Sequence, residues 1–189
     1  MTDLIIREIT GYLLQYKDRA VIVGIAFVAI RLVVAFFKRY KDKRNIAGKQ
    51  WLRLAVDVVV DFLAAFYVVM VVMITFFSRR EGSTDVINME LFSTFRQDIR
   101  SKSFIIENIL LFVPFGCLIR WYGIRRYRIA FLLLAGTSIV IECMQYLSGR
   151  GRMEVDDILT NTFGGSIGFV FAVLFFQVLH IVKGKRRKK

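Results

Sequence analysis

The chain has 189 residues, of which 56% are hydrophobic and 23% charged, and its formal net charge is +13. The apolar residues form long runs, which excludes an ordinary soluble domain and predicts an integral membrane protein. Because the Lys and Arg residues lie between these runs and at the C-terminus, we interpret the charge as topology determinants and anionic-lipid contacts, and we expect no nucleic-acid partner.

The first part of the chain predicts a surface helix followed by two membrane spans. Residues 1–19 carry apolar side chains at helical spacing, which favours an interfacial amphipathic helix. The runs 20–37 and 54–77 are each long enough to cross a hydrocarbon core, and the strongly basic stretch 38–53 between them suits a cytoplasmic loop. Residues 20–77 are thus the first two spans with their basic loop. Arg31 and Asp61 fall at matching depths, so we expect a structural ion pair between them.

The rest of the chain predicts a polar loop and a core of three spans. Residues 78–103 are polar and suit an extracellular loop that holds a short element such as NMELFSTF. The core, residues 104–182, contains apolar runs at 104–121, 129–147 and 158–182, followed by a basic tail at 183–189. Pro114 lies inside the third span and should kink that helix. The fold class is therefore an all-α, polytopic membrane bundle of about five transmembrane helices.

The distribution of basic residues predicts the orientation of the bundle. With the C-terminus inside, the inner segments hold 17 Lys and Arg and the outer segments hold 10. This bias favours an N-outside, C-inside topology. It also brings the polar residues of the last three spans to one level, at the outer boundary.

This outer level defines the candidate site, because ionisable groups at membrane depth usually face a bundle interior or a wet cavity. Ser138, Glu142, Gln145 and Gly149 fall on one face of the fourth span. The candidate catalytic residues are Glu142, Asp156 and Asp157, and the candidate substrate-binding residues are Asn108, Gln145, Arg150, Arg152 and Asn161. We expect Asn108, Glu142, Arg152, Asp157 and Asn161 to share one contact network.

The residue types of this site suit more than one chemistry. Paired carboxylates near an arginine can do acid–base work, hold a divalent cation or grip a lipid phosphate. An ion-pair cluster that locks three helices together is a structural alternative. No cofactor or metal is assigned from the sequence, and whether the protein is an enzyme stays open. Gly164 and Gly168 permit close helix packing within or between chains, and His180 is expected to be a surface residue.

Three ordered motifs carry a resemblance to a known family. They are NILLFVPFG at 108–116, IECMQ at 141–145 and RMEVDDILTNTFGG at 152–165. With them, residues 104–170 resemble the VanZ-like family of bacterial membrane proteins. Two features depart from the family pattern: Glu154, Asp156 and Asp157 compete for its first carboxylate position, and Arg150 competes with Arg152 for its arginine.

The resemblance implies a multi-pass plasma-membrane protein of the bacterial cell envelope, linked to low-level resistance to glycopeptide antibiotics such as teicoplanin. The convergence of opposite charges from three spans at the outer boundary leads to our first hypothesis, that this pocket binds or modifies a lipid-linked or cell-surface amphiphile. The expected partners are membrane lipids, either anionic lipids or a lipid-linked cell-wall precursor, and a homo-oligomer is an open alternative. The other hypothesis is a non-catalytic membrane factor that acts through helix association or partner proteins.

Overall fold

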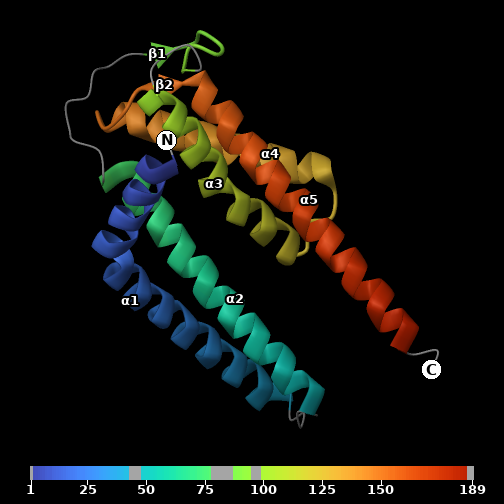
Figure 1. Cartoon of the computed structure of the whole chain (residues 1–189). Helices are drawn as coiled ribbons and strands as arrows, with labels where there is room; N and C mark the ends of the chain where they lie inside the picture. The colour runs from blue at the N-terminus through green and yellow to red at the C-terminus, as the bar shows by residue number, and fades with distance from the viewer. Residues whose placement is uncertain (1, 43–47, 78–86, 95–98, 187–189) are drawn as a thin grey trace. The chain divides into compact units, whose positions relative to one another are not determined.

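The computed structural model describes residues 2–42, 48–77, 87–94 and 99–186, and these residues are almost entirely helical (Figure 1). The elements are α1 (Thr2–Asp42), α2 (Gly48–Val72), the π-helix η1 (Met73–Phe77), β1 (Ile87–Asn88), α3 (Ile99–Trp121), α4 (Tyr127–Leu147), β2 (Met153–Glu154) and α5 (Val155–Arg186). The predicted all-α class is confirmed.

Four of the described helices are long and apolar enough to cross a membrane, which identifies a membrane protein. They cover Leu52–Phe77, Lys102–Trp121, Tyr127–Leu147 and Val155–Val182. The predicted first span, 20–37, lies within α1, which continues without a break from the predicted interfacial helix 1–19. The side chains at the end of this span lie outside the described residues, so the count of five spans and their orientation stay predictions.

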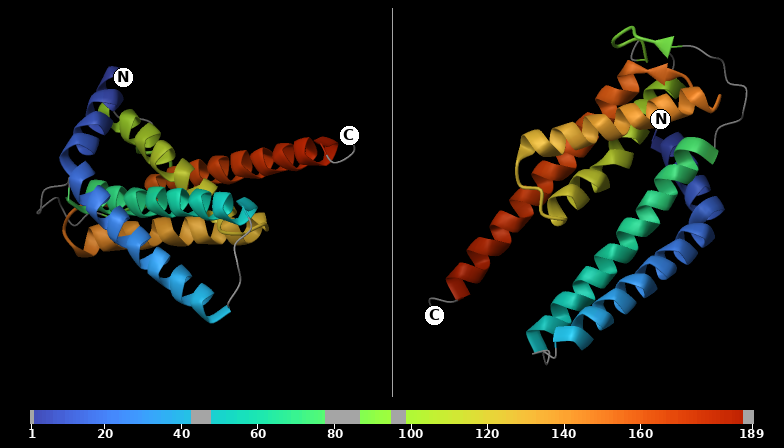
Figure 2. Two further views of the ribbon diagram at one scale, coloured as in Figure 1. Left: turned by 90° about the horizontal axis from the view of Figure 1, so that it is seen from below. Right: turned by 180° about the vertical axis from the view of Figure 1, so that it is seen from behind.

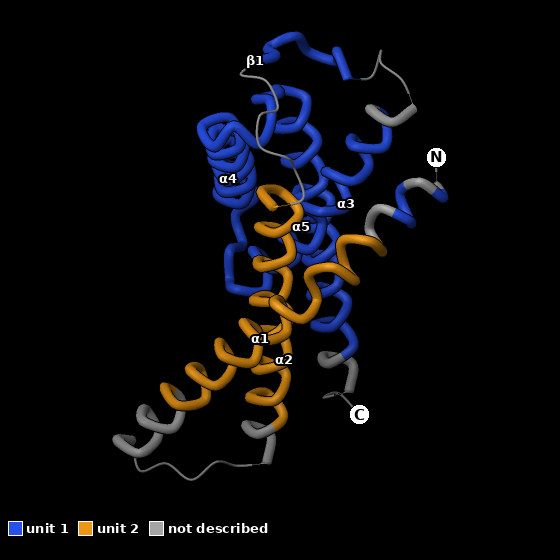
Figure 3. The backbone as a smooth tube through the Cα atoms, turned by 90° about the vertical axis from the view of Figure 1, so that its left-hand side faces the viewer, with its two compact units in different colours: residues 1–7, 79–189 blue, residues 8–78 orange. Residues whose placement is uncertain are grey.

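The chain divides into two compact units, residues 8–78 and residues 1–7 with 79–189 (Figure 3). In the first unit, α1 and α2 run antiparallel, with Tyr16 and Ala20 packed against Met70. Nε of Arg31 donates to Oδ2 of Asp61 at 2.8 Å, which is the pairing expected from their matched depths. The Asp61 side chain is only 5% exposed, so this contact compensates a carboxylate that is buried on an apolar helix.

In the second unit, α3 packs most extensively along α5, and α4 covers the same helix from another side (Figure 2). A Cβ added at Gly164 would overlap the backbone of Ile109, and one at Gly168 would overlap that of Val113. Because Gly164 lies opposite Ile109 and Gly168 opposite Val113, α3 and α5 run parallel. This is expected when α4 runs antiparallel to both and short turns join the three helices. The absence of side chains at these glycines is what lets the two backbones approach.

The core of this unit is an apolar cluster next to the glycine contacts. It is formed by the buried side chains of Phe112, Ile119, Ala130, Leu134 and Phe169. Pro114 lies within α3, which continues through it to Trp121, and its side chain is exposed. The close contacts of Gly164 and Gly168 with α3, hereafter the glycine seam, and the apolar cluster fix the relative positions of α3, α4 and α5. These three helices carry the polar residues.

At one end of the unit, β1 pairs in parallel with β2, with Ile87 opposite Met153 and Asn88 opposite Glu154 (Figure 1). Residues 87–94, hereafter the cap segment, include all but the last residue of the predicted NMELFSTF element, whose Phe95 lies outside the described residues. The side-chain amide of Asn88 donates to Oγ of Ser93 at 2.8 Å, and its Oδ1 accepts the N–H of Glu90 at 3.1 Å. These local bonds fold the cap segment into a compact turn.

Candidate functional site

The polar stripe of α4 faces the interior of its unit. Ser138 is fully buried, Glu142 is 2% exposed and Gln145 is 1% exposed. These three side chains occupy successive turns of a helix whose other faces are rich in exposed apolar residues, including Leu132, Val140 and Leu147. The periodicity read from the sequence therefore corresponds to an inward-facing polar row.

A tight turn after α4 returns the chain to this row. Gly149 has a positive φ of 64°, and its N–H donates to the Tyr146 carbonyl at 3.0 Å. The N–H of Arg150 donates to the Gln145 carbonyl, also at 3.0 Å. This pair of bonds is a Schellman motif, which ends the helix with glycine in the left-handed region. The turn places β2 beside α4, and the Glu154 N–H donates to Oε2 of Glu142 at 3.1 Å.

Asp156 attaches the cap segment to the start of α5. Its Oδ1 accepts the N–H of Phe92 at 2.7 Å and its Oδ2 accepts the N–H of Thr94 at 2.9 Å. The Thr94 hydroxyl also lies 3.4 Å from Oε2 of Glu154. Phe92 adopts a φ of 61°, a left-handed conformation that is costly for a bulky side chain and is held here by the carboxylate.

Asp157 and Asn161 lie on α5 one turn apart, and both are buried, with exposures of 8% and 4%. Nδ2 of Asn161 donates to Oγ of Ser138 at 3.0 Å, which joins α5 to the polar row of α4. Oδ1 of Asn161 is buried without a hydrogen-bond partner. The hydroxyl of Thr160 donates to the Asp156 carbonyl at 2.9 Å, so the hydrogen bond of this hydroxyl is made within α5 itself.

Asn108 approaches this level from α3. The parallel register of α3 and α5 puts Asn108 and Asn161 within about 3 Å of the same depth. Nδ2 of Asn108 is also buried without a hydrogen-bond partner. Two amides on neighbouring helices thus each present a buried atom whose hydrogen-bonding capacity is unused.

The predicted arginines are less buried than the predicted carboxylates and amides of α4 and α5, and the predicted ion pair lies elsewhere. Arg152 is exposed and Arg150 is half-buried, and both take part in interactions within the protein. Arg31 and Asp61 belong to the other unit, so their pair is a separate feature. Within the described part of the chain, no group of three His, Cys, Asp or Glu side chains is arranged to hold a metal ion.

Sequence reasoning missed the contribution of the cap segment. Its backbone N–H groups are the partners of Asp156, and they lie more than sixty positions earlier in the chain. No local pattern announces such a contact. The one available signal was the small polar cluster in NMELFSTF, whose Asn and Ser residues are typical of a turn.

The fold and this polar cluster define a helical membrane protein in which carboxylates and amides are buried at one end of a three-helix unit. The profile of the VanZ/LLP1 family matches residues 63–176, and the chain belongs to this family. It is also similar to Protein VanZ of Enterococcus faecium, with 31% identity over 67 residues. That match covers 33% of this chain and 40% of the Enterococcus protein. No solved structure matches the chain.

Proposed function

We propose that this protein acts in the bacterial plasma membrane, where it contributes to low-level resistance to glycopeptide antibiotics such as teicoplanin by binding a lipid-linked or cell-surface amphiphile at its polar cluster. The observation that carries the proposal is the pair of unused amide atoms, Nδ2 of Asn108 and Oδ1 of Asn161. A buried polar atom without a partner costs about 1–3 kcal/mol. Hydroxyl, amide or phosphate groups of an amphiphile would offset that cost by supplying the missing hydrogen bonds.

The contacts of the carboxylates divide their roles in this proposal. Both oxygens of Asp156 already accept backbone N–H groups, so Asp156 acts by holding the cap segment. Glu142 and Asp157 are the carboxylates that orient the bound amphiphile or exchange a proton with it. Arg150 and Arg152 lie between α4 and β2 and would provide positive charge for an anionic headgroup.

The cap segment controls access in the same proposal. Glu142 and Gln145 are buried, and β1 of the cap segment pairs with β2, whose Glu154 N–H donates to Glu142, so movement of residues 87–94 would open a path to them. This segment is attached through a strand pair of two residues and through Asp156, and short elements of this kind open locally more easily than long packed helices. Its apolar side chains Ile87, Met89 and Leu91 are exposed and would contact the acyl part of the ligand.

The test combines resistance with binding. In a strain that lacks its own copy, Glu142→Gln should abolish the teicoplanin resistance that the unaltered chain restores. The purified variant should bind a lipid-linked cell-wall precursor about tenfold more weakly, which corresponds to one charge-assisted hydrogen bond. The melting temperature should stay close to that of the unaltered protein, because the amide keeps the size of the side chain.

Asp57→Asn is the matched control, since it also removes one carboxylate from an apolar helix but at an exposed position in the other unit. It should leave resistance and binding intact. If Glu142→Gln and Arg152→Ala both fold and both retain full precursor binding, the proposed site is wrong.

The alternative hypothesis, a non-catalytic factor that acts through helix association, loses its original motivation. Gly164 and Gly168 pack against α3 of the same chain, so they are not available as a contact between chains. A chain in which Glu142→Gln keeps resistance while changes on exposed helix faces abolish it would favour this alternative.

A further inference from the structure

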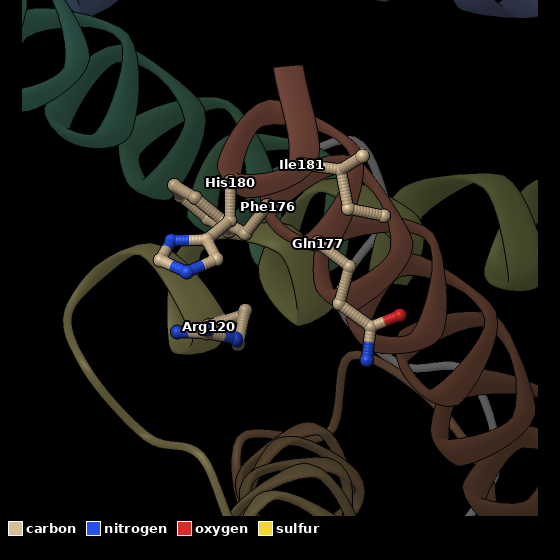
Figure 4. A pocket seen from close by; sticks show the side chains of 5 residues that line it. All are labelled: Arg120, Phe176, Gln177, His180 and Ile181. Carbon is tan, nitrogen blue, oxygen red and sulfur yellow. The ribbon is translucent and has the colours of Figure 1, made fainter. Parts of the chain in front are cut away.

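A depression lies at the end of the three-helix unit opposite the polar cluster. It has a volume of about 420 Å³ and is lined by Arg120, Phe176, Gln177, His180 and Ile181 (Figure 4). Arg120 comes from the last turn of α3, and the other four residues come from two successive turns on one face of α5. Asp156 and His180 are separated by about 36 Å along α5, so the depression and the polar cluster lie at opposite membrane boundaries.

The lining side chains combine cationic and neutral donors with an apolar wall. The Arg120 and His180 side chains are directed into the same depression, with Gln177 beside them (Figure 4). The described residues that line it include no carboxylate. Phe176 and Ile181 supply the apolar part of the wall. A guanidinium, an imidazole and an amide around an apolar surface are the groups that recognise a phosphate with attached hydrocarbon.

Arg120 is held in place without losing its charge. Its guanidinium carbon lies 4.8 Å from the centre of the Phe176 ring, a cation–π contact. The ring of Trp121 also contacts the Phe176 ring, with 5.6 Å between ring centres. Because an aromatic ring does not neutralise the guanidinium as a carboxylate would, the positive charge remains available to an anion.

The depth of the depression and its basic surroundings point to a lipid as the source of that anion. Trp121 is of the type that gathers at the headgroup level of membranes. Arg125 and Arg126 are exposed in the adjoining turn between α3 and α4, and Arg128 is exposed at the start of α4. Basic pockets between membrane helices near their ends are suited to anionic lipid headgroups.

We propose that this depression binds the phosphate of an anionic phospholipid, with Arg120 and His180 on the phosphate, Gln177 on the headgroup, and Phe176 and Ile181 against the first part of an acyl chain. The site is independent of the proposed polar cluster and of the direction in which the chain crosses the membrane.

The experiment uses the full-length purified protein in lipid nanodiscs or detergent micelles and measures bound lipid by native mass spectrometry. Phosphatidylglycerol should stay bound in preference to phosphatidylcholine. Arg120→Gln should weaken phosphatidylglycerol retention about tenfold, as expected for one charge-assisted contact with a phosphate. Arg128→Gln, which removes the same charge from an exposed position at the start of α4, should change retention less than about twofold.

Gln177→Glu is a second variant, which protects the test against misfolding because Gln177 is exposed and its size is unchanged. The new carboxylate should repel the phosphate and reduce retention, whereas Gln15→Glu, at an exposed position on α1, should have no effect. Equal losses for Arg120→Gln and Arg128→Gln would overturn the site in favour of general surface attraction. Displacement of the lipid by inorganic phosphate at millimolar concentration would overturn the lipid assignment and leave a site for soluble phosphates.

Discussion

Both carboxylate oxygens of Asp156 accept backbone N–H groups, from Phe92 and Thr94. A buried carboxylate that satisfies two backbone donors stabilises the segment that provides them, because each donor would otherwise be unpaired in a poorly hydrated place. Asp157, the next residue in the chain, has a different environment on α5. Asp156 is thus assigned a structural contact by its hydrogen-bond partners, which the sequence alone does not distinguish from its neighbour Asp157.

At the residue scale, we predict that Asp156→Asn loosens the cap segment while α4 and α5 stay folded. The amide retains one acceptor but turns an N–H group toward a backbone donor, which costs about 1–3 kcal/mol. Hydrogen exchange at the amides of Phe92 and Thr94 should become about tenfold to a hundredfold faster, in proportion to that cost. The amide of Ile124, which donates to the Ile119 carbonyl in a distant turn, serves as the internal reference. Unchanged exchange at residues 92 and 94 would contradict the anchoring role.

At the scale of elements, the seam between α3 and α5 positions the site. Backbone atoms of Ile109 and Val113 occupy the space that side chains would take at Gly164 and Gly168. Moving the two helices apart would increase the distance between Asn108 and Asn161. The glycine positions on α5 therefore set how closely the two amides approach each other.

We predict that Gly164→Ala destabilises the protein by about 1–3 kcal/mol, because the new methyl group overlaps a carbonyl oxygen that belongs to a neighbouring backbone. Gly136→Ala is the control, since nothing lies within 4 Å of a Cβ built there. This control should be neutral or stabilising by up to about 1 kcal/mol, as expected from helix propensity. Thermal unfolding in detergent separates the two variants. A Gly164→Ala protein as stable as the control would show that the seam tolerates a side chain.

At the scale of the whole molecule, orientation follows from charge, because positive residues near membrane spans are retained on the cytoplasmic side. The 17 basic residues counted inside, against 10 outside, predict that the polar cluster lies at the outer boundary. The same orientation would place the depression around Arg120 at the inner boundary.

We predict that an impermeant thiol reagent added to intact cells labels Ser148→Cys and misses Gly184→Cys. Ser148 is exposed just after α4, and Gly184 lies near the C-terminal end of α5. The background should carry Cys117→Ala and Cys143→Ala, because both native thiols are half-buried and free. Labelling after the membrane is opened provides the control for accessibility. Labelling of position 184 alone in intact cells would reverse the topology and move the polar cluster to the cytoplasmic boundary.

The sequence by itself determined the features that depend on local hydropathy and spacing. Long apolar runs predict membrane helices, and the observed α4 begins and ends within two residues of the predicted span 129–147. The steps of three and four between Ser138, Glu142 and Gln145 predicted a single polar face. The matched depths of Arg31 and Asp61 likewise pointed to the contact that joins α1 to α2.

The tertiary structure alone decided which distant groups meet. The cap segment reaches Asp156 across a long stretch of chain, and Phe92 takes a backbone conformation that its residue type does not favour. The role of Gly164 as an internal seam and the approach of Arg120 to Phe176 also depend on how helices pack. Periodicity describes one helix at a time, whereas these contacts depend on the register between helices, which is set by close packing of backbones and side chains.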